Sequence, residues 1–131
     1  MFNILQSTNK WLKKFGWSWR RSVLWSNPKE SKLGLDTEDY AMIDFSLSDR
    51  QFTIEYNELR QEEMSESVTV HELLHITFDA LDVVVEPMIE KLTDEKTSSI
   101  LKNIYHSEED RVIDELAGLI VRVSGGGQES D

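Results

Sequence analysis

The feature that most constrains this chain is an apolar, helix-compatible run at residues 68–82 that contains the pattern His-Glu-x-x-His. His71 and His75 are four residues apart, so on a helix both imidazoles lie on one face and can bind one cation. Glu72 is rotated by about 100° around the axis, where it can hold a metal-bound water as a general base. The run therefore predicts a zinc site on this helix. The alternative is that Thr69 and Glu72 form a capping box at the helix start.

A catalytic zinc site needs a third protein ligand and leaves one position open for water. The candidates lie in a second periodic run, residues 106–123, because Glu109 falls in the middle of its apolar face. A carboxylate on an apolar face is costly unless it is paired or binds a metal. We therefore predict Glu109 as the third ligand, with Glu108 and His106 as substitutes. The alternative is that a helix begins here and that its acidic residues favour the N-terminal dipole.

Together, the motif at residues 71–75 and the stretch Ser-Glu-Glu-x-x-Val-Ile-Asp-Glu-Leu-Ala at residues 107–117 resemble the minimal zincins with a glutamate ligand. Phages often carry such proteins, which are related to the ImmA/IrrE-like metallopeptidases. The resemblance covers about residues 40–123. It implies zinc-dependent hydrolysis of peptide bonds, in which Glu72 activates the zinc-bound water. It also implies that Tyr105 and His106, the nearest candidates in the sequence, stabilise the developing oxyanion.

Other positions of the motif helix refine this interpretation. A metzincin would need glycine in place of Phe78 and histidine in place of Leu81, and the bacterial rRNA-maturation endoribonucleases would need glycine in place of Glu72. Neither pattern is met. Asp79 and Asp82 can accept the free ring N–H of a ligand histidine, although a solvated helix face explains Asp79 as well.

The remaining patterns predict a small α+β domain, with a short antiparallel strand pair and about three to four helices. Residues 41–45 and 52–56 alternate apolar and polar side chains, as in a half-buried hairpin. A short amphipathic helix is expected at residues 3–15, ended by Gly16, whereas residues 17–25 fit a helix or a strand. The motif helix should stop near Pro87, because the residue before a proline is pushed out of the helical region. Residues 88–105 fit one bent helix or two short ones.

The first 35 residues differ in composition from the rest of the chain. They hold seven basic residues, one acidic residue and all four tryptophans. Such a segment can form a nucleic-acid groove, a membrane-surface helix or an arm that docks a protein partner. It can also fold back over its own acidic domain, with tryptophans capping the core. We favour the last interpretation. The expected organisation is thus an N-terminal segment at 1–35 that packs on or extends from the domain, a zincin-like domain at 36–123 and a disordered tail at 124–131.

Composition excludes several classes of protein. The 25 acidic residues exceed the 14 basic ones, which argues against general nucleic-acid binding. The chain has no cysteine, so disulfides and thiolate zinc sites are excluded. No apolar run approaches a membrane span, and no signal peptide is evident, so we expect a cytoplasmic protein or one packaged in a virion. The leading functional prediction is a zinc metallopeptidase acting on a protein or peptide. The alternative is a zinc-stabilised, non-catalytic adaptor that docks a partner through residues 1–35.

Overall fold

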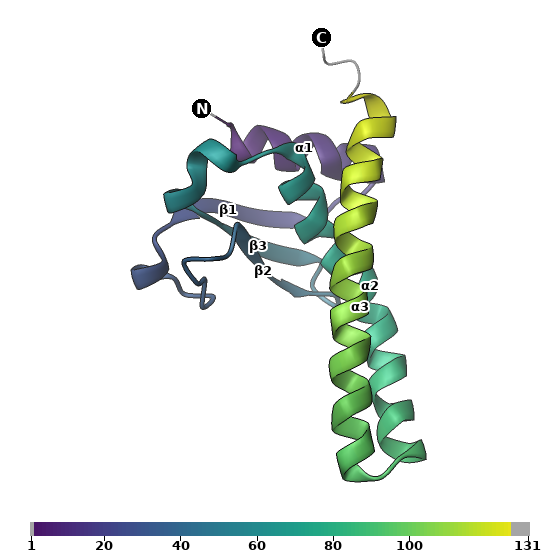
Figure 1. Ribbon diagram of the computed structural model, residues 1–131. Helices are drawn as coiled ribbons and strands as arrows, with labels where there is room; N and C mark the ends of the chain where they lie inside the picture. The colour runs from purple at the N-terminus through teal and green to yellow at the C-terminus, as the bar shows by residue number, and fades with distance from the viewer. Residues whose placement is uncertain (1, 127–131) are drawn as a thin grey trace. The chain divides into compact units, whose positions relative to one another are not determined.

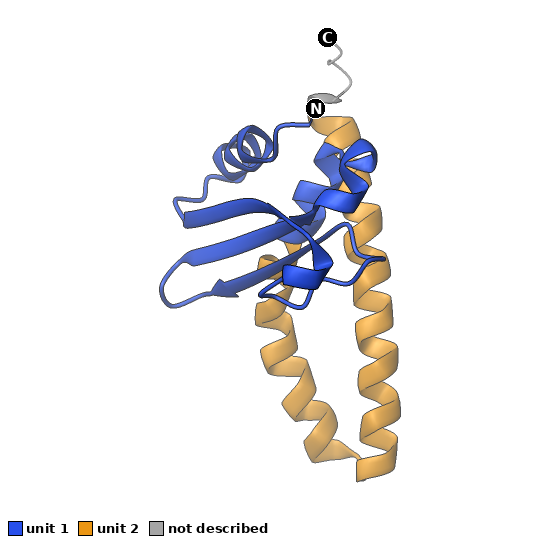
Figure 2. Ribbon diagram, turned by 90° about the vertical axis from the view of Figure 1, so that its left-hand side faces the viewer, with its two compact units in different colours: residues 1–73 blue, residues 74–131 orange. Residues whose placement is uncertain are grey.

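The computed structural model describes residues 2–126 and belongs to the predicted α+β class (Figure 1). The chain divides into two compact units, residues 1–73 and residues 74–131, which Figure 2 distinguishes by colour. We call the first the sheet unit and the second the hairpin unit. The predicted boundary at residue 35 does not coincide with this division. Among the described residues, no helix has both the length and the apolar character needed to cross a bilayer.

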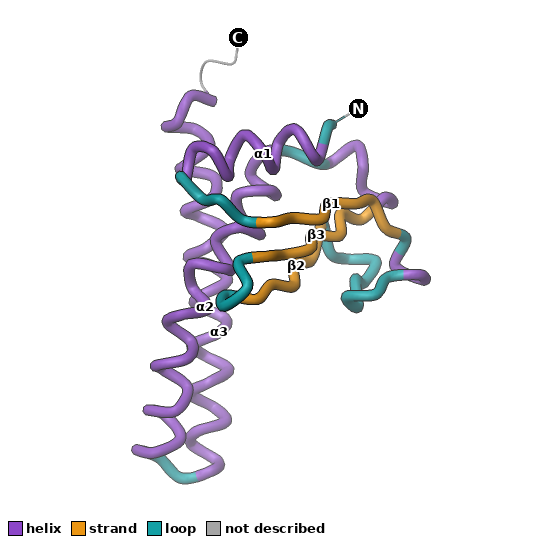
Figure 3. The backbone as a smooth tube through the Cα atoms, turned by 180° about the vertical axis from the view of Figure 1, so that it is seen from behind, coloured by secondary structure: helices purple, strands orange, loops and turns teal. Residues whose placement is uncertain are grey.

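The sheet unit is built on three strands in the order β1-β3-β2 (Figure 3). Strands β2 (Ala41–Ser46) and β3 (Gln51–Asn57) are antiparallel, which confirms the predicted strand pair. Strand β1 (Arg20–Ser26) pairs in parallel with β3, so the undecided segment at residues 17–25 contributes a strand. The central strand buries Ile54 and Tyr56 completely. The sheet is therefore mixed, with β3 protected on both edges.

Helix α1 (Ile4–Phe15) confirms the helix expected near the N-terminus. The Asn3 side chain accepts a hydrogen bond from the amide of Gln6, which caps the helix start. Gly16 ends the helix with φ of 74°, a left-handed conformation that glycine adopts without steric cost. Trp11 and Leu12 face inwards and are 1% and 2% exposed. The helix therefore contributes directly to the core of the sheet unit.

The basic, aromatic N-terminal segment makes contacts within the sheet unit. The indole Nε1 of Trp11 donates to Glu66 at 2.9 Å, and the ammonium of Lys10 pairs with the same carboxylate at 2.8 Å. Aromatic rings then follow one another from α1 to the sheet, with centroids 5.2 to 6.3 Å apart; they are Trp11, Phe15, Trp17, Trp19 and Phe52. These aromatic residues thus contact one another within the sheet unit.

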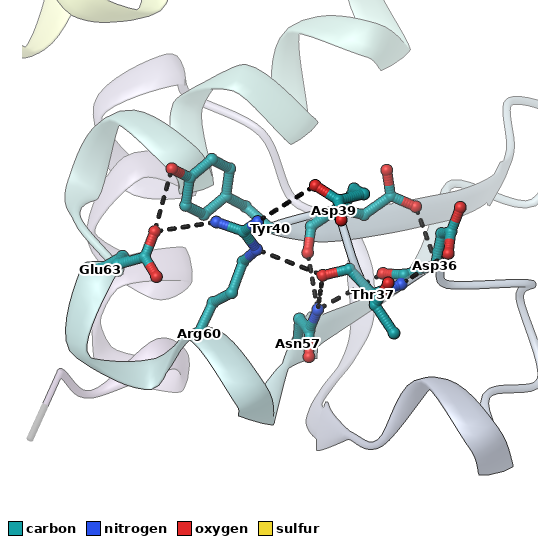
Figure 4. Close-up of polar contacts among 8 residues, drawn as sticks. Asp36, Thr37, Asp39, Tyr40, Asn57, Arg60 and Glu63 are labelled. Atoms are coloured by element: carbon teal, nitrogen blue, oxygen red, sulfur yellow. Dashed lines mark hydrogen bonds and ion pairs between the residues drawn. The ribbon is translucent and has the colours of Figure 1, made fainter.

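A buried asparagine fixes the loop that leads into β2 (Figure 4). Asn57 is fully buried, and its side-chain amide donates to the backbone carbonyls of Asp36, Thr37 and Asp39, the last at 2.8 Å. Its side-chain oxygen accepts from the amide of Leu59 at 2.9 Å. One side chain therefore closes the loop and caps the 3-10 helix at Glu58–Glu63.

Two long helices follow, α2 (Glu66–Leu92) and α3 (Glu95–Val121). The prediction that the motif helix stops near Pro87 was wrong, because α2 continues for five residues beyond it. Proline removes one helical hydrogen bond, the one to the carbonyl of Val83. Val83 is 64% exposed and Pro87 is exposed as well, so we attribute the tolerance to water that can reach the unpaired carbonyl.

The start of α3 corrects a second expectation. Asp94 caps this helix by accepting a hydrogen bond from the amide of Thr97 at 2.8 Å. Glu109 therefore lies in the middle of a helix, and the alternative that a helix begins near it was wrong. Residues 122–126 form a π-helical turn after α3. The rest of the segment expected to be a disordered tail, residues 127–131, lies outside the described residues.

Candidate metal centre

The His-Glu-x-x-His motif lies within α2, an uninterrupted helix that begins at Glu66. His71 and His75 are therefore one turn apart on the same helix, as the spacing predicted. Both histidines are half-buried, and Glu72 is 6% exposed. The boundary between the two units falls inside the motif, between residues 73 and 74.

The capping-box alternative for Glu72 was wrong, because Thr69 lies inside α2 and its hydroxyl has other partners. It accepts a hydrogen bond from Ser7 at 3.0 Å and pairs with the phenol of Tyr56 at 2.8 Å. Thr8 lies 3.4 Å from the same phenol oxygen. Burial raises the pKa of Tyr56, the bonds to Thr69 and Thr8 lower it, and the negative charge of Glu72 raises it further. In the sheet unit, Glu72 thus lies close enough to a buried hydroxyl network to affect its ionisation.

A second polar cluster lies in the hairpin unit, between α2 and α3. The phenol of Tyr105 donates to Asp82 at 2.8 Å and to Glu109 at 3.4 Å. His106 Nε2 lies 2.6 Å from Glu86, and its Nδ1 lies 3.6 Å from Glu109. The Glu109 side chain is only 8% exposed. Two carboxylates and an imidazole from facing helices therefore converge around one phenol.

The cluster shifts the pKa values of its own members. Burial, together with the hydrogen bond that protonated Glu109 donates to Asp82 and the negative charge of Asp82, raises the pKa of Glu109 from 4.5 to about 7, against an opposing effect of His106. For His106, burial lowers the pKa, but the carboxylates of Glu86 and Glu109 outweigh it and the net shift is upward. Burial and the bond to Asp82 raise the pKa of Tyr105, so the phenol stays protonated near neutral pH. Glu109 thus holds its proton closer to neutral pH than an isolated carboxyl group does.

This arrangement has the composition of a cation site. Asp82, His106 and Glu109 each offer one ligand atom, and the three atoms lie within 4.8 Å of one another. Imidazole nitrogen and carboxylate oxygen are ligands of Zn²⁺. The carboxylate of Glu86 contacts Nε2 of His106, whereas Nδ1 of the same ring faces Glu109. A carboxylate on the far nitrogen of a ligand histidine is the usual way to fix its ring.

The structure thus brings together three residues that the sequence singled out, Tyr105, His106 and Glu109, with Asp82 beside them. Glu86 was missed. The signal was present, because Asp82 and Glu86 are four residues apart and share one face of α2. The sequence alone does not give the register of α2 against α3. This register determines which residues of α3 contact this face of α2.

The register of α2 against α3 also affects which residue of α3 is a candidate for the third zinc ligand. The cross-helix pairs Glu90–Lys102, Glu86–His106 and Asp82–Tyr105 show that the two helices run antiparallel. His75 lies seven residues before Asp82, which is about 10 Å along a helix. Continuing the register brings residues near 112–116 of α3 to the level of His75, and the carboxylates there are Asp114 and Glu115. The ligand role of Glu109 stays a prediction, and Asp114 joins it as a candidate.

In comparisons with known proteins, no protein-family model, no curated protein and no solved structure matched this chain. The resemblance to glutamate-ligand zincins therefore stays a prediction that depends on the motif residues.

Proposed function

We propose that the protein is a zinc-dependent peptidase whose metal is held by His71 and His75 of α2 and by a carboxylate of α3. The observation that supports this proposal is the placement of the complete motif on one uninterrupted helix, with Glu72 buried in between. A protein or peptide is the expected substrate, and cytoplasm is the expected compartment.

Each motif residue has a distinct part in the proposed reaction. His71 and His75 would hold the metal through imidazole nitrogens. A zinc ion held there would supply Lewis acidity, which lowers the pKa of a water ligand towards neutrality and polarises the substrate carbonyl. Glu72 accepts the proton of the attacking water and passes it to the leaving amine.

Two residues of α3 compete for the role of third ligand. Glu109 was predicted from its position on an apolar face, and Asp114 follows from the register of the hairpin. Isosteric Glu109→Gln and Asp114→Asn variants separate them, because only loss of a true ligand should weaken zinc binding, typically by tenfold or more. Glu115 serves as the control, since its carboxylate already pairs with Arg111 at 3.0 Å on the exposed surface.

A second candidate function is a non-catalytic protein in which a cation joins the two helices of the hairpin. The specific observation in its favour is the convergence of Asp82, His106 and Glu109 from α2 and α3. A cation there would neutralise two carboxylates that otherwise repel each other, and would so stabilise the hairpin. Such a protein would act as an adaptor, and residues 1–35 were the predicted contact with its partner.

The deciding experiment is elemental mass spectrometry of protein purified without a histidine tag and then reconstituted with zinc. Near-stoichiometric zinc that is lost in His75→Ala but kept in His106→Ala supports the peptidase, and the opposite pattern supports the hairpin cation. Glu72→Gln should keep the metal and the fold while abolishing peptide hydrolysis. A well-folded protein without zinc after reconstitution would contradict both candidates.

A further inference from the structure

The outer face of α2 in the hairpin unit is apolar and exposed. Four large side chains form one stripe, with spacings of three, four and four residues that keep them within an arc of about 80°. They are Leu81, Val84, Met88 and Leu92, which are 47%, 57%, 53% and 77% exposed. We call these four residues the α2 stripe. An exposed apolar stripe of this kind usually marks an interaction site.

The charges of α2 lie on its other side. Asp79, Asp82, Glu86 and Glu90 occupy the half of the helix opposite the stripe. The contacts with Tyr105, His106 and Lys102 show that this acidic half faces α3. The one charged residue at the edge of the stripe in this part of α2 is Lys91. The printed polar contacts of α2 with α3 thus lie on its acidic half, away from the α2 stripe.

The hairpin unit has little core of its own to explain its stability. Among its described residues, the buried apolar side chains are Leu74, Ile76, Ile113 and Ala117. More large apolar side chains are exposed than buried in this unit, and two paired helices need buried apolar surface to be stable in water. Covering the α2 stripe would supply such surface.

We propose that the α2 stripe binds the α2 stripe of a second copy of this chain, in antiparallel orientation about a two-fold axis. The stripe is self-complementary in this arrangement, as a two-fold interface requires. An axis between Val84 and Met88 places Val84 opposite Met88 of the second copy and Leu81 within about one residue of Leu92 of the second copy. The spacing of the four residues is nearly the same when read in either direction.

Charge also favours a second copy at this face. The chain has a net charge of −11, although residues 1–35 are basic, so two copies repel each other at long range. The α2 stripe carries no acidic residue, so like-charge repulsion does not oppose contact there. The core of a protein interface is typically depleted of charged residues in the same way. Salt should strengthen the dimer, because it screens the remaining repulsion.

The first test is sedimentation velocity of the full chain over a roughly hundredfold concentration range. We expect a monomer–dimer equilibrium, which Val84→Glu and Met88→Glu should shift to monomer. Ile104→Glu on α3 is the matched control, because Ile104 is 54% exposed and lies outside the α2 stripe. A wild-type monomer at every concentration, or an equal effect of Ile104→Glu, would overturn the proposal.

The second test fixes the orientation, using single cysteines in a chain that has none. Antiparallel packing places residue 81 near residue 92 of the other copy, so Leu81→Cys mixed with Leu92→Cys should form disulfide-linked dimers under mild oxidation. Each variant alone should remain largely uncrosslinked. Efficient crosslinking of each variant by itself would indicate parallel packing and overturn the proposed orientation.

A lipid surface is the other occupant that an apolar helix face could take. Flotation with phosphatidylcholine vesicles, with and without phosphatidylserine, tests it directly. We expect no capture of the wild-type protein. Capture that is lost in Met88→Glu, together with a monomeric protein in solution, would assign the stripe to membranes and overturn the dimer.

Discussion

The phenol of Tyr105 donates a hydrogen bond to the carboxylate of Asp82 at 2.8 Å, across the two helices of the hairpin unit. The same phenol lies 3.4 Å from Glu109, so one hydroxyl stands between two carboxylates. Because the hydroxyl has one proton, it cannot donate fully to both. Glu109 retains a proton near neutral pH, and this proton completes the hydrogen-bond network between the two carboxyl groups.

Replacing Tyr105 with Phe should destabilise the protein. The change removes the bond to Asp82 and leaves two carboxylates facing each other, at a cost of about 1 to 2 kcal/mol. Urea unfolding followed by circular dichroism measures the free energy of unfolding. Tyr40→Phe is the control, because the Tyr40 phenol is exposed and bonds Glu63 at 3.2 Å on the surface. Equal effects of the two changes would show that the phenol of Tyr105 is not structural.

The raised pKa of Glu109 predicts a pH dependence of stability in the metal-free protein. The folded state holds a proton on Glu109 between pH 4.5 and about 7, where the unfolded state has released it. Stability is therefore greatest below pH 4.5 for this group and falls as the pH rises to about 7. The raised pKa of His106 acts in the same direction. The expected loss from Glu109 is about 1 to 3 kcal/mol.

Glu109→Gln tests this assignment, because an amide can donate to Asp82 at any pH. We expect the variant to be more stable than wild type above pH 7 and to show a flatter profile. Unfolding in urea at intervals from pH 4 to about 8, with chelator present, gives the profile. An unchanged slope in Glu109→Gln would mean that another group titrates.

In the sheet unit, Tyr56→Phe should cost more than its small change in size suggests. The phenol of Tyr56 is fully buried and pairs with Thr69 at 2.8 Å, so its removal leaves a buried threonine hydroxyl short of one partner. The expected loss is about 1 to 2 kcal/mol. Combining it with Thr69→Val, which removes the other partner, should cost less than the sum of the single changes. Full additivity in this double-mutant cycle would argue against the bond.

Asn57→Ala should be among the more damaging changes in this unit. It leaves the carbonyls of Asp36, Thr37 and Asp39 without their shared donor and removes the cap of Leu59. We expect a loss of about 2 to 4 kcal/mol. Asn57→Asp should be no better, since a carboxylate cannot donate to carbonyls. Thermal unfolding of both variants checks this, and a near-wild-type melting temperature for Asn57→Asp would contradict it.

Pro87→Ala should stabilise the protein by about 1 kcal/mol, because it restores a helical hydrogen bond inside α2. The greater freedom of alanine in the unfolded chain partly offsets this gain. Urea unfolding gives the sign. Thr77→Ala, at another exposed position of α2, controls for helix propensity alone. A destabilised Pro87→Ala variant would indicate that the proline ring makes packing contacts that the protein needs.

Local signals predicted the elements best. The cap at Gly16 and the alternation in residues 41–45 and 52–56 each depend on neighbouring residues, and both predictions were confirmed. Residues 17–25 could not be assigned, because a strand at the edge of a sheet is defined by its pairing with β3, which is far away in the sequence. The prediction that the motif helix stops near Pro87 was wrong for a related reason. The exposure of Val83, to which we attribute the tolerance of the proline, is a property of the fold.

For the candidate site, the sequence suggested residue types, whereas their arrangement depends on the fold. The spacing of the motif fixes the relation of His71 to His75 on α2. By contrast, the residues that contact Glu109 depend on the length of the turn at residues 93–94 and on the resulting register of α3 against α2. A shift of one helical turn would exchange Asp82 for another partner, and no local pattern in the sequence encodes that choice.

Helix α2 belongs to both units, because its first eight residues lie in the sheet unit and the rest in the hairpin unit. Neither unit can lose its fold without disrupting hydrogen bonds of the helix they share. Helix formation is cooperative along the chain, so fraying that starts on one side of residue 73 weakens the other side. We therefore expect a single calorimetric transition whose van't Hoff and calorimetric enthalpies agree, as in a protein with one domain.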